Sequence, residues 1–254
     1  MITSDQVKRA NLEVYNRKNL HDYSTNPSIF NPSRQAEIHR ILEELRDSTG
    51  CPDGRLLDLG CGTGNLLALA KPIFREVVGL DIAGKLLAQL RREDGGLRLT
   101  AGETGRLPFP REAFDVISLY AVLHHLFDPK VTFQEAYRCL KPGGYLYTDH
   151  DPNRGFMRFY HVYYRLRHWR QPGFGSHAEE LAEYHNTQDA GLDPEALAAG
   201  LRLAGFREVA VHYRHTDNTN LGRSVGFALG ILKGISRIVA LKSLYTHFWI
   251  VARK

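Results

Sequence analysis

Short apolar segments alternate with segments of helical periodicity between residues 34 and 150. In the first helical segment, residues 34–47, four apolar residues recur at the spacing of one helix face: Ile38, Ile41, Leu42 and Leu45. Five apolar segments predict strands: RLLDL (55–59), EVVGLD (76–81), LRLT (97–100), FDVISLY (114–120) and GYLYTDH (144–150). The sequence KPGG (141–144) predicts a tight turn between the last helix and the last strand of this series. Because parallel strands need a crossover between them, usually a helix, the alternation predicts an α/β fold with a buried parallel sheet.

The alternation is interrupted twice after residue 150. A helix is expected next, with Asp193 as N-cap, Pro194 at the first helical position and Gly205 beyond its end. Two strands follow it, REVAVHYR (207–214) and HFWIVARK (247–254). We therefore divide the chain into an N-terminal segment (1–33), an α/β core (34–153), an aromatic and basic insert (154–190), a core helix and strand (191–217), an amphipathic helical insert (218–244) and a last core strand (245–254).

Composition narrows the cellular setting. The first residues, MITSDQVKRANLE, are polar and charged, so we expect no signal peptide. The longest apolar run, VGFALGIL (225–232), is shorter than the roughly 20 residues that span a bilayer. Cys51, Cys61 and Cys139 show no metal-binding or redox spacing. We expect reduced thiols in a cytoplasmic protein without a metal site.

The charge of the chain is uneven. Up to residue 150, 19 Lys and Arg residues balance 19 Asp and Glu residues, whereas the remainder holds 14 and 9. This excess is either an ordinary solvated surface or a basic face that attracts an acidic substrate, a nucleic acid or an anionic membrane.

A glycine-rich loop follows the first predicted strand, in RLLDLGCGTGN (55–65). Such a loop lets the backbone approach a ligand closely. It lacks the lysine of a phosphate-binding P-loop, and Asn65 stands where a dinucleotide-binding fingerprint needs its third glycine. Asp81 ends the next strand, where a carboxylate can accept both hydroxyls of a ribose, and Glu103 follows one strand later. These features together predict a pocket for an adenosine group without a pyrophosphate cradle.

The loop and three later segments resemble the successive motifs of the class I S-adenosylmethionine-dependent methyltransferases. The segments are LLDLGCGTGN, VVGLDIAGKLL, GETGRLPFPREAFDVISLYAVLHHL and EAYRCLKPGGYLYTDHDPN, which span about residues 36–153 with the helical segment before them. They are most similar to the small-molecule branch that includes the quinone-biosynthesis methyltransferases. The resemblance implies a Rossmann-like α/β fold with a seven-stranded mixed sheet, helices on both faces and helical cap insertions.

The resemblance also implies which residues bind S-adenosylmethionine. The methionine end is assigned to Asp58, Gly60, Cys61, Gly62, Gly64 and the backbone carbonyl of Tyr120, the ribose to Asp81, and the adenine to Ile82, Glu103 and Thr104. Glu103 and Thr104 stand where the family often has Asp-Ala, so the adenine contact is the one that departs from the family pattern.

Methyl transfer from a sulfonium needs a base only if the acceptor must lose a proton. His150 and Asp151 end the fifth strand, and a carboxylate beside a histidine is expected to raise its pKa. Since successive strand residues face opposite ways, at most one of the two points at the acceptor if the strand continues. His124 and His125 follow the fourth strand, where the family commonly has histidine in a structural or catalytic role. Our catalytic candidates are His150, Asp151 and His125.

In this family the acceptor pocket is usually roofed by the N-terminal segment and by the insert after the fifth strand. Four tyrosines of these segments are candidate acceptor contacts: Tyr15, Tyr23, Tyr160 and Tyr164. The arginines between the aromatic residues of the first insert leave three interpretations open, which are a half-buried helix, a pocket for an aromatic or acidic acceptor, and a nucleic-acid surface. The amphipathic segment 221–241 is a core or lid helix, a dimer surface or an interfacial helix on anionic lipid.

We conclude that the sequence predicts transfer of a methyl group to a small molecule that is aromatic, lipophilic or acidic. Nucleic acid is the less favoured partner, since the Asn/Asp-Pro-Pro-aromatic stretch of enzymes that methylate base amines is replaced by SLYAVL (118–123). The alternatives are an RNA or protein methyltransferase that uses the basic C-terminal part, and a catalytically silent protein that binds the cofactor. The oligomeric state stays open.

Overall fold

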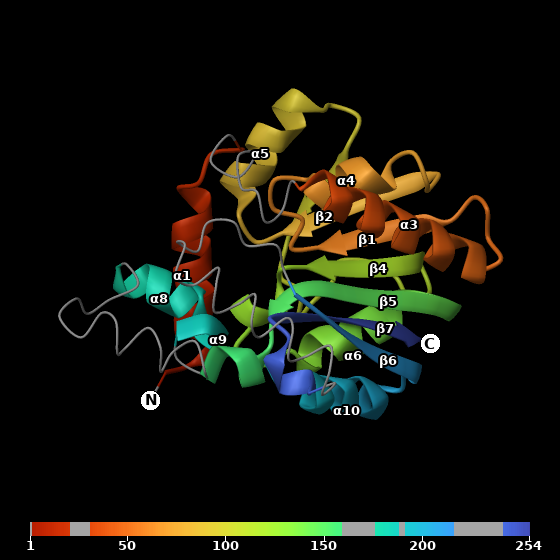
Figure 1. Ribbon diagram of the computed structural model, residues 1–254. Coiled ribbons are helices and arrows are strands. Elements are labelled where there is room, and N and C mark those ends of the chain that lie inside the picture. The colour runs from red at the N-terminus through yellow and green to blue at the C-terminus, as the bar shows by residue number, and fades with distance from the viewer. Residues whose placement is uncertain (1, 21–30, 159–175, 188–190, 216–240) are drawn as a thin grey trace.

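The computed structural model describes residues 2–20, 31–158, 176–187, 191–215 and 241–254. Its centre is a sheet of seven strands in the order β3-β2-β1-β4-β5-β7-β6 (Figure 1). The strands are β1 (Arg55–Leu59), β2 (Glu76–Asp81), β3 (Arg98–Ala101), β4 (Phe114–Tyr120), β5 (Leu140–Pro152), β6 (Arg207–Arg214) and β7 (His247–Arg253). Strands β1 to β5 pair in parallel, and β7 is antiparallel to both β5 and β6. The expected Rossmann-like fold with a seven-stranded mixed sheet is therefore confirmed.

Helices cover both faces of the sheet. The helices are α3 (Pro32–Ser48), α4 (Asn65–Ala70) and α5 (Gly84–Glu93) on one face, and α6 (Lys130–Cys139) and α10 (Pro194–Ala204) on the other. The helices on each face bury their apolar side chains in a hydrophobic cluster of their own. The four apolar residues predicted for one face of α3 are all buried. The predicted caps of α10 are also present, because the Asp193 side chain accepts the amides of Glu195 and Ala196 and Gly205 is left-handed. Local sequence signals and burial therefore agree over the core.

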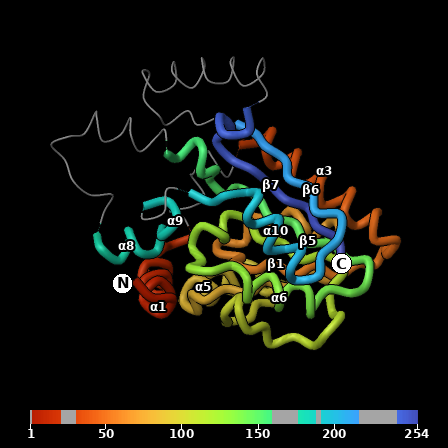
Figure 2. Tube along the Cα trace, turned by 90° about the horizontal axis from the view of Figure 1, so that it is seen from below, coloured from red at the N-terminus to blue at the C-terminus, as the bar shows by residue number. Residues whose placement is uncertain are grey.

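Three helices lie beyond the carboxyl ends of the parallel strands. They are α1 (Ser4–Asn16), α8 (His177–Ala182) and α9 (Tyr184–Thr187), and both views place them together at this end of the sheet (Figures 1 and 2). A capping box between Thr3 and Gln6 starts α1, and a second one between Ser176 and Glu179 starts α8. There are also two short 3-10 helices in the described part of the chain. The first, η1 (Leu123–His125), follows β4, and the second, η2 (Lys242–Leu244), precedes β7. The expected cap over the sheet edge thus includes an N-terminal helix and two short helices of the first insert.

The KPGG segment differs from its predicted role as a turn between elements. Helix α6 ends at Cys139 and β5 begins directly at Leu140, so residues 141–144 belong to the strand. The strand register shifts across them, since Leu140 pairs with Phe114 whereas Tyr145 pairs with Val116. The extra residues form a bulge in which Gly143 takes a positive φ of 78°.

Several predictions fall outside the described residues. Tyr23, Tyr160 and Tyr164 lie there, as does nearly all of the segment 221–241. Among the helices that the structure describes, none combines the length and the apolar character needed to cross a bilayer.

Candidate active site

A cavity of about 1080 Å³ opens at the carboxyl ends of the parallel strands. Most of the residues predicted to bind the cofactor line it: Asp58, Gly60, Cys61, Gly62, Asp81, Ile82, Glu103, Thr104 and Tyr120. Residues of α1, of the segment around α8 and α9, and of β7 also line it. Candidate residues of the other kinds also line it, namely Tyr15, His125 and His150. Gly64 and Asp151 are not part of the lining, although Asp151 is hydrogen-bonded to His124, which is.

The glycine loop connects β1 to α4 in a conformation that other residues adopt poorly. Gly60 has a φ of 71°, and a Cβ atom there would lie 2.6 Å from Val122 Cγ2. Gly64 has a φ of 81° at the N-cap of α4, where a Cβ atom would lie 2.9 Å from Leu90 Cδ2. Side chains at these positions would strain the backbone and collide with the core, so glycine is required by both conformation and space.

Asp81 connects the end of β2 to this loop. Its Oδ2 accepts the backbone amide of Gly62 at 2.8 Å, and its Oδ1 accepts the amide of Ala83 at 2.8 Å. Burial raises the pKa of Asp81, and these backbone hydrogen bonds oppose the rise. A carboxylate has about four acceptor positions, so each oxygen keeps capacity for a further donor from the cavity. This geometry suits the predicted contact with two ribose hydroxyls.

Asp58 is the second buried carboxyl group of the cavity. It lies near the end of β1, next to the loop, and its Oδ1 accepts a hydrogen bond from Ser118 Oγ at 2.8 Å. Burial, aided by the charge of Asp81, raises the pKa of Asp58 to about 7, although the bond from Ser118 opposes the rise. A cationic group in the cavity would favour the ionised form of Asp58.

Glu103 and Thr104 already have protein partners. The Glu103 carboxylate forms an ion pair of 2.8 Å with Lys8 of α1, and both side chains are about half exposed. The Thr104 hydroxyl lies 2.9 Å from that of Thr132 on α6. The ion pair ties α1 to the loop after β3, so a ligand that uses Glu103 competes with Lys8 or shares the carboxylate with it.

His150 does not have the electrostatics that its sequence position suggested. Its ring is stacked between those of Tyr120 and His247, with centroid distances of 5.3 and 4.9 Å. Burial, together with the positive charges of Arg214 and Arg34, lowers the pKa of His150 to about 3. The expectation of a raised pKa was wrong, because the neighbouring carboxylate Asp151 is directed at another residue.

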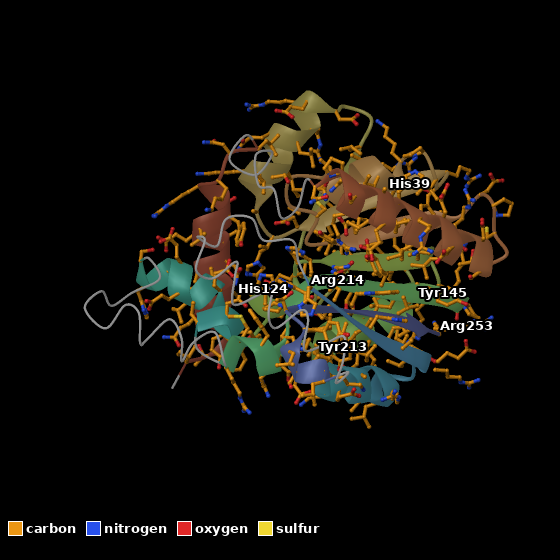
Figure 3. The ribbon with its side chains drawn as sticks, in the orientation of Figure 1. His39, His124, Tyr145, Tyr213, Arg214 and Arg253 are labelled. Carbon is orange, nitrogen blue, oxygen red and sulfur yellow. The ribbon has the colours of Figure 1, made fainter. Side chains whose placement is uncertain are left out.

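The residue that the Asp151 carboxylate contacts is His124. Asp151 Oδ1 accepts hydrogen bonds from the backbone amide of His124 at 3.1 Å and from its Nδ1 at 2.8 Å. On the other side of the ring, Nε2 lies 3.6 Å from Oε2 of Glu183, which stands between α8 and α9 in the chain. Glu183 was not among the predicted site residues, and no local pattern distinguishes it from the other glutamates around α8. Figure 3 shows His124 at the end of the sheet opposite Tyr145 and Arg253.

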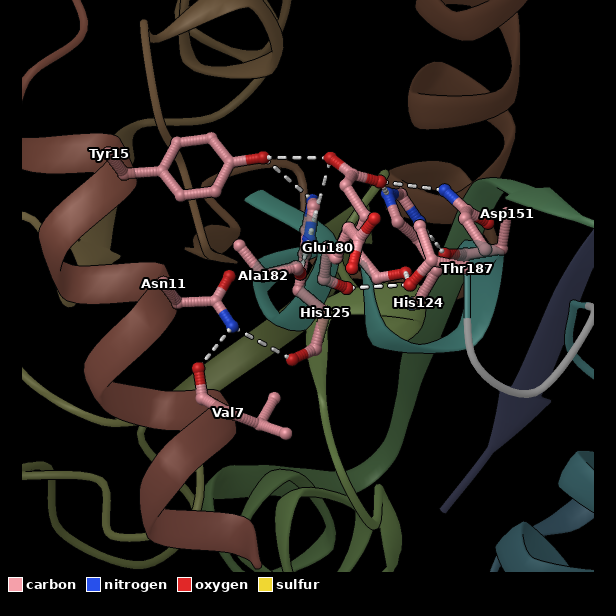
Figure 4. A network of polar contacts seen from close by, with 11 residues as sticks. Val7, Asn11, Tyr15, His124, His125, Asp151, Glu180, Ala182 and Thr187 are labelled. Carbon is pink, nitrogen blue, oxygen red and sulfur yellow. Dashed lines mark hydrogen bonds and ion pairs between the residues drawn. The ribbon is translucent and has the colours of Figure 1, made fainter. Parts of the chain in front are cut away.

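His125 connects the cap to the core. Its Nδ1 lies 2.7 Å from the carbonyl of Ala182, and its Nε2 lies 3.1 Å from the hydroxyl of Tyr15 (Figure 4). The amide group of Asn11 donates to the backbone carbonyl of His125 at 3.1 Å. Burial and the adjacent His124 lower the pKa of His125 to about 4, so the ring is neutral near pH 7. With both nitrogens engaged, His125 holds α1 and α8 over the cavity.

A buried carboxylate on β5 is the other feature that the sequence analysis missed. Asp149 of β5 is fully buried and forms ion pairs with Arg34 of α3 and Arg214 of β6. It also accepts a hydrogen bond from the hydroxyl of Tyr147. The two arginines lie 115 and 65 residues away from Asp149 in sequence, so no short motif could indicate the cluster.

Comparison with known proteins agrees with the geometry. Residues 57–148 match the family model described as a methyltransferase domain. A demethylmenaquinone methyltransferase of a Geobacillus species is 31% identical over 62% of this chain and 72% of its own length. The enzyme of the same name from Thermus thermophilus is 35% identical over 60% of this chain and 74% of its own length. That from Staphylococcus carnosus is 28% identical over 76% of this chain and 86% of its own.

Solved structures show the same fold at lower identity. An S-adenosylmethionine-dependent methyltransferase of Thermotoga maritima, described as a possible histamine N-methyltransferase, superposes with a TM-score of 0.57 at 20% identity, over 96% of this chain and 99% of the other. Phosphoethanolamine N-methyltransferase 2 of Haemonchus contortus, solved with S-adenosylmethionine, gives a TM-score of 0.54 at 17% identity, over 88% of this chain and 52% of the other. At these identities the likeness concerns the fold alone.

Proposed function

The chain belongs to the class I S-adenosylmethionine-dependent methyltransferases, and we propose that its acceptor is a small, lipophilic aromatic molecule. Its cofactor is S-adenosylmethionine, which supplies a methyl group on a positively charged sulfur. The residues of the cavity fit this cofactor. The Asp81 carboxylate suits the ribose, and the buried Asp58 carboxyl next to the glycine loop suits the cationic methionine end. Catalysis in such a site rests largely on holding donor and acceptor close and aligned.

The size of the cavity is the observation that carries the proposal. Pockets for a single small ligand have volumes of about 300–1000 Å³. The cavity of about 1080 Å³ lies at the upper limit of that range, and it is lined both by the glycine loop and by residues of α1 and the insert. Apart from the residues assigned to the cofactor, the cavity is lined by apolar and aromatic side chains that include Tyr15, Leu126, Phe127, Phe156 and Met157. One cavity therefore offers room for the cofactor and for an apolar second molecule.

Charge favours an uncharged acceptor over an acidic one. Among the described residues that line the cavity, Lys8 is the single Lys or Arg, whereas six are acidic: Asp58, Asp81, Glu103, Asp128, Glu179 and Glu183. This excess of carboxyl groups opposes the phosphates of RNA and the carboxylates of an acidic small molecule. The relatives named for demethylmenaquinone add support for an aromatic quinone, or its reduced form, as the acceptor.

Transfer of a tritium-labelled methyl group tests the proposal. The purified enzyme is incubated with labelled S-adenosylmethionine and, in separate reactions, a reduced naphthoquinone, bulk tRNA or a total protein extract. We expect label in the naphthoquinol reaction and none above background in the other two. Asp81→Ala serves as the control with weakened cofactor binding, assayed at a cofactor concentration close to the wild-type Kd. Label in tRNA or protein alone would contradict the proposal, and cofactor binding without any transfer would favour the catalytically silent alternative.

Two further proposals concern location. The three cysteines are free thiols, in keeping with a cytoplasmic enzyme. A lipophilic acceptor would be reached most easily from a membrane surface, and the segment 221–241, nearly all of which lies outside the described residues, has the composition of an interfacial helix. Flotation with anionic liposomes at low salt tests this contact, and absence of the protein from the floating fraction would exclude it.

A further inference from the structure

His124 is held in one orientation at the wall of the cavity. Its side chain is about 10% exposed, and the two bonds to Asp151 Oδ1 restrain both its backbone and its ring. Because a carboxylate oxygen accepts, Nδ1 is the protonated ring nitrogen in this pair. The neutral ring therefore carries its lone pair on Nε2. The nearest acidic oxygen, Glu183 Oε2, lies 3.6 Å from that nitrogen, beyond hydrogen-bond distance.

The other histidines at the cavity are less suited to accept a proton. His125 uses both ring nitrogens to hold α1 and α8. His150 and His247 are stacked on each other, and burial and the charge of Arg214 hold the pKa of each below its usual value. Among the described lining residues, His124 is thus the imidazole that combines an oriented Nδ1 with a nitrogen free of hydrogen bonds.

We propose that His124 is the catalytic base that removes the proton of a phenolic hydroxyl on the acceptor, and that Asp151 is the positioning residue that orients it. This inference rests on the proposed function. The hydroxyl proton passes to Nε2 of His124, and an electron pair of the resulting phenolate forms the new bond to the methyl carbon. The carbon–sulfur bond breaks at the same time, and its electron pair remains on sulfur, which becomes a neutral thioether. If a ring carbon attacks in place of oxygen, the proton of that carbon leaves as well, and the Glu183 carboxylate is the adjacent acceptor for it.

The surrounding charges fit a base that works near neutral pH. Burial lowers the pKa of His124, but the hydrogen bond with Asp151 and the charges of Glu183 and Asp151 outweigh this effect and raise it above its usual value. Among the described residues, the titratable groups that act on the ring are Asp151, Glu183, His125, His150 and His247, and Tyr15 contacts two of these, His125 and Glu183. Asp151 and Glu183 favour the imidazolium, whereas the three other histidines are neutral at this pH because their pKa values are lowered. The rate should therefore rise with pH as His124 loses its proton.

The test compares three variants of the full chain with the wild type in the labelled methyl transfer to the naphthoquinol. His124→Gln removes the base, Asp151→Asn removes the charge that orients it, and His39→Gln changes an exposed histidine that pairs with Glu43 on α3. Rates are measured from about pH 5.5 to about pH 9, a range that spans the titration of histidine. We expect His124→Gln to lower kcat at least about 100-fold and to abolish the rise with pH. Asp151→Asn should shift the rise to lower pH, and His39→Gln should match the wild type.

Three outcomes would overturn the inference. The first is a His124→Gln variant that keeps the wild-type kcat and pH profile, which would leave the proposed function intact. The second is activity that EDTA removes and a divalent cation restores, since the donor atoms of His124, His125 and Glu183, which lie within 4.8 Å of one another, would then hold a cation. The third outcome comes from NMR titration of isotope-labelled histidine, in which the pKa of His124 is not raised or is left unchanged by Asp151→Asn. This titration does not depend on activity. It therefore still tests the role of Asp151 if the wild type transfers no label to naphthoquinol and the proposed function fails.

Discussion

Asp81 at the end of β2 accepts the backbone amide of Gly62 at 2.8 Å, so the residue predicted to bind the ribose also holds the glycine loop in place. The register of the sheet makes this possible, because Leu59 of β1 pairs with Leu80 of β2 and both strands end at the same level. One carboxylate thus connects the two segments that the cofactor is expected to contact.

Asp81→Ala should weaken S-adenosylmethionine binding by about 1.5–3 kcal/mol, or about 10- to 150-fold in Kd, because a charged hydrogen-bond acceptor is lost. Titration calorimetry measures this change directly. Asp94→Ala is the matched control, since Asp94 is an exposed aspartate that pairs with Lys71 at the protein surface. An unchanged Kd in Asp81→Ala would show that the ribose assignment is in error.

Asp58 should make cofactor binding depend on pH. Its pKa of about 7 means that the carboxyl group is mostly protonated at pH 5.5 and half ionised at pH 7. A cationic ligand requires the ionised form, so we expect S-adenosylmethionine to bind about tenfold more tightly at pH 7 than at pH 5.5. Asp58→Asn should bind weakly and with little dependence on pH over this interval. Equal pH dependence in the two proteins would exclude Asp58 as the titrating group.

The raised pKa of Asp58 also makes the stability of the fold depend on pH. Ionisation of Asp58 favours cofactor binding, but it lowers the free energy of unfolding of the cofactor-free protein. Because the pKa of Asp58 is raised in the folded protein, its stabilising contribution is present at pH values below the unfolded pKa. This contribution is lost as the pH rises through about 7. Asp58→Asn should therefore gain stability relative to the wild type as the pH rises from about 4 to about 7 when no cofactor is present, and the difference should be constant above about pH 7. Thermal unfolding of both proteins at several pH values measures the difference, and parallel curves would contradict it.

Tyr15→Phe should loosen the cap. The Tyr15 hydroxyl lies 3.1 Å from His125 Nε2 and 3.4 Å from Glu183 Oε1, so its removal leaves two partly buried side chains with one polar partner fewer. We expect a loss of about 1–2 kcal/mol in the free energy of unfolding, measured with denaturant. Tyr184→Phe is the control, because its ring packs on Phe127 and no described residue forms a hydrogen bond with its hydroxyl. Equal stability of the two variants would show that the Tyr15 contacts do not hold the cap.

Asp149→Ala should destabilise the fold most strongly. Its removal leaves the guanidinium groups of Arg34 and Arg214, whose side chains are 10% and 13% exposed, without their buried partner. Breaking a buried ion pair from one side costs about 3–5 kcal/mol. Denaturant unfolding against Asp53→Ala, at an exposed aspartate, measures this cost. A loss below about 1 kcal/mol, the value typical of exposed pairs, would show that solvent or other groups compensate the arginines.

The cofactor side of the cavity could be predicted from the sequence because its residues follow strands directly. Asp58, Asp81 and Glu103 come at or just after the ends of β1, β2 and β3, and parallel strands bring their carboxyl ends to one edge. The parallel topology therefore brings together residues that follow successive strands in the sequence. The structure places all three around one cavity, although the pairing of Glu103 with Lys8 had no sequence signal.

The acceptor side could not be predicted in this way. The alternation of strand residues was expected to decide between His150 and Asp151, but His150 has a positive φ of 64° and the β5–β7 register shifts between Thr148 and Asp151. The strand does not continue regularly there, so alternation does not determine which side chain faces the cavity. The ring of His150 faces the cavity, and Asp151 turns to His124, 27 residues away.

The sequence by itself determined the class of fold, the succession of strands around the glycine loop and the cofactor, because these depend on periodicity, turn residues and contiguous motifs. Only the tertiary structure decided which imidazole is oriented by a carboxylate and which residues close the cavity. Those contacts join η1, β5, α1 and the segment of Glu183, which are distant along the chain. Their geometry depends on side-chain directions at irregular ends of elements, and residue types and spacing do not specify these directions.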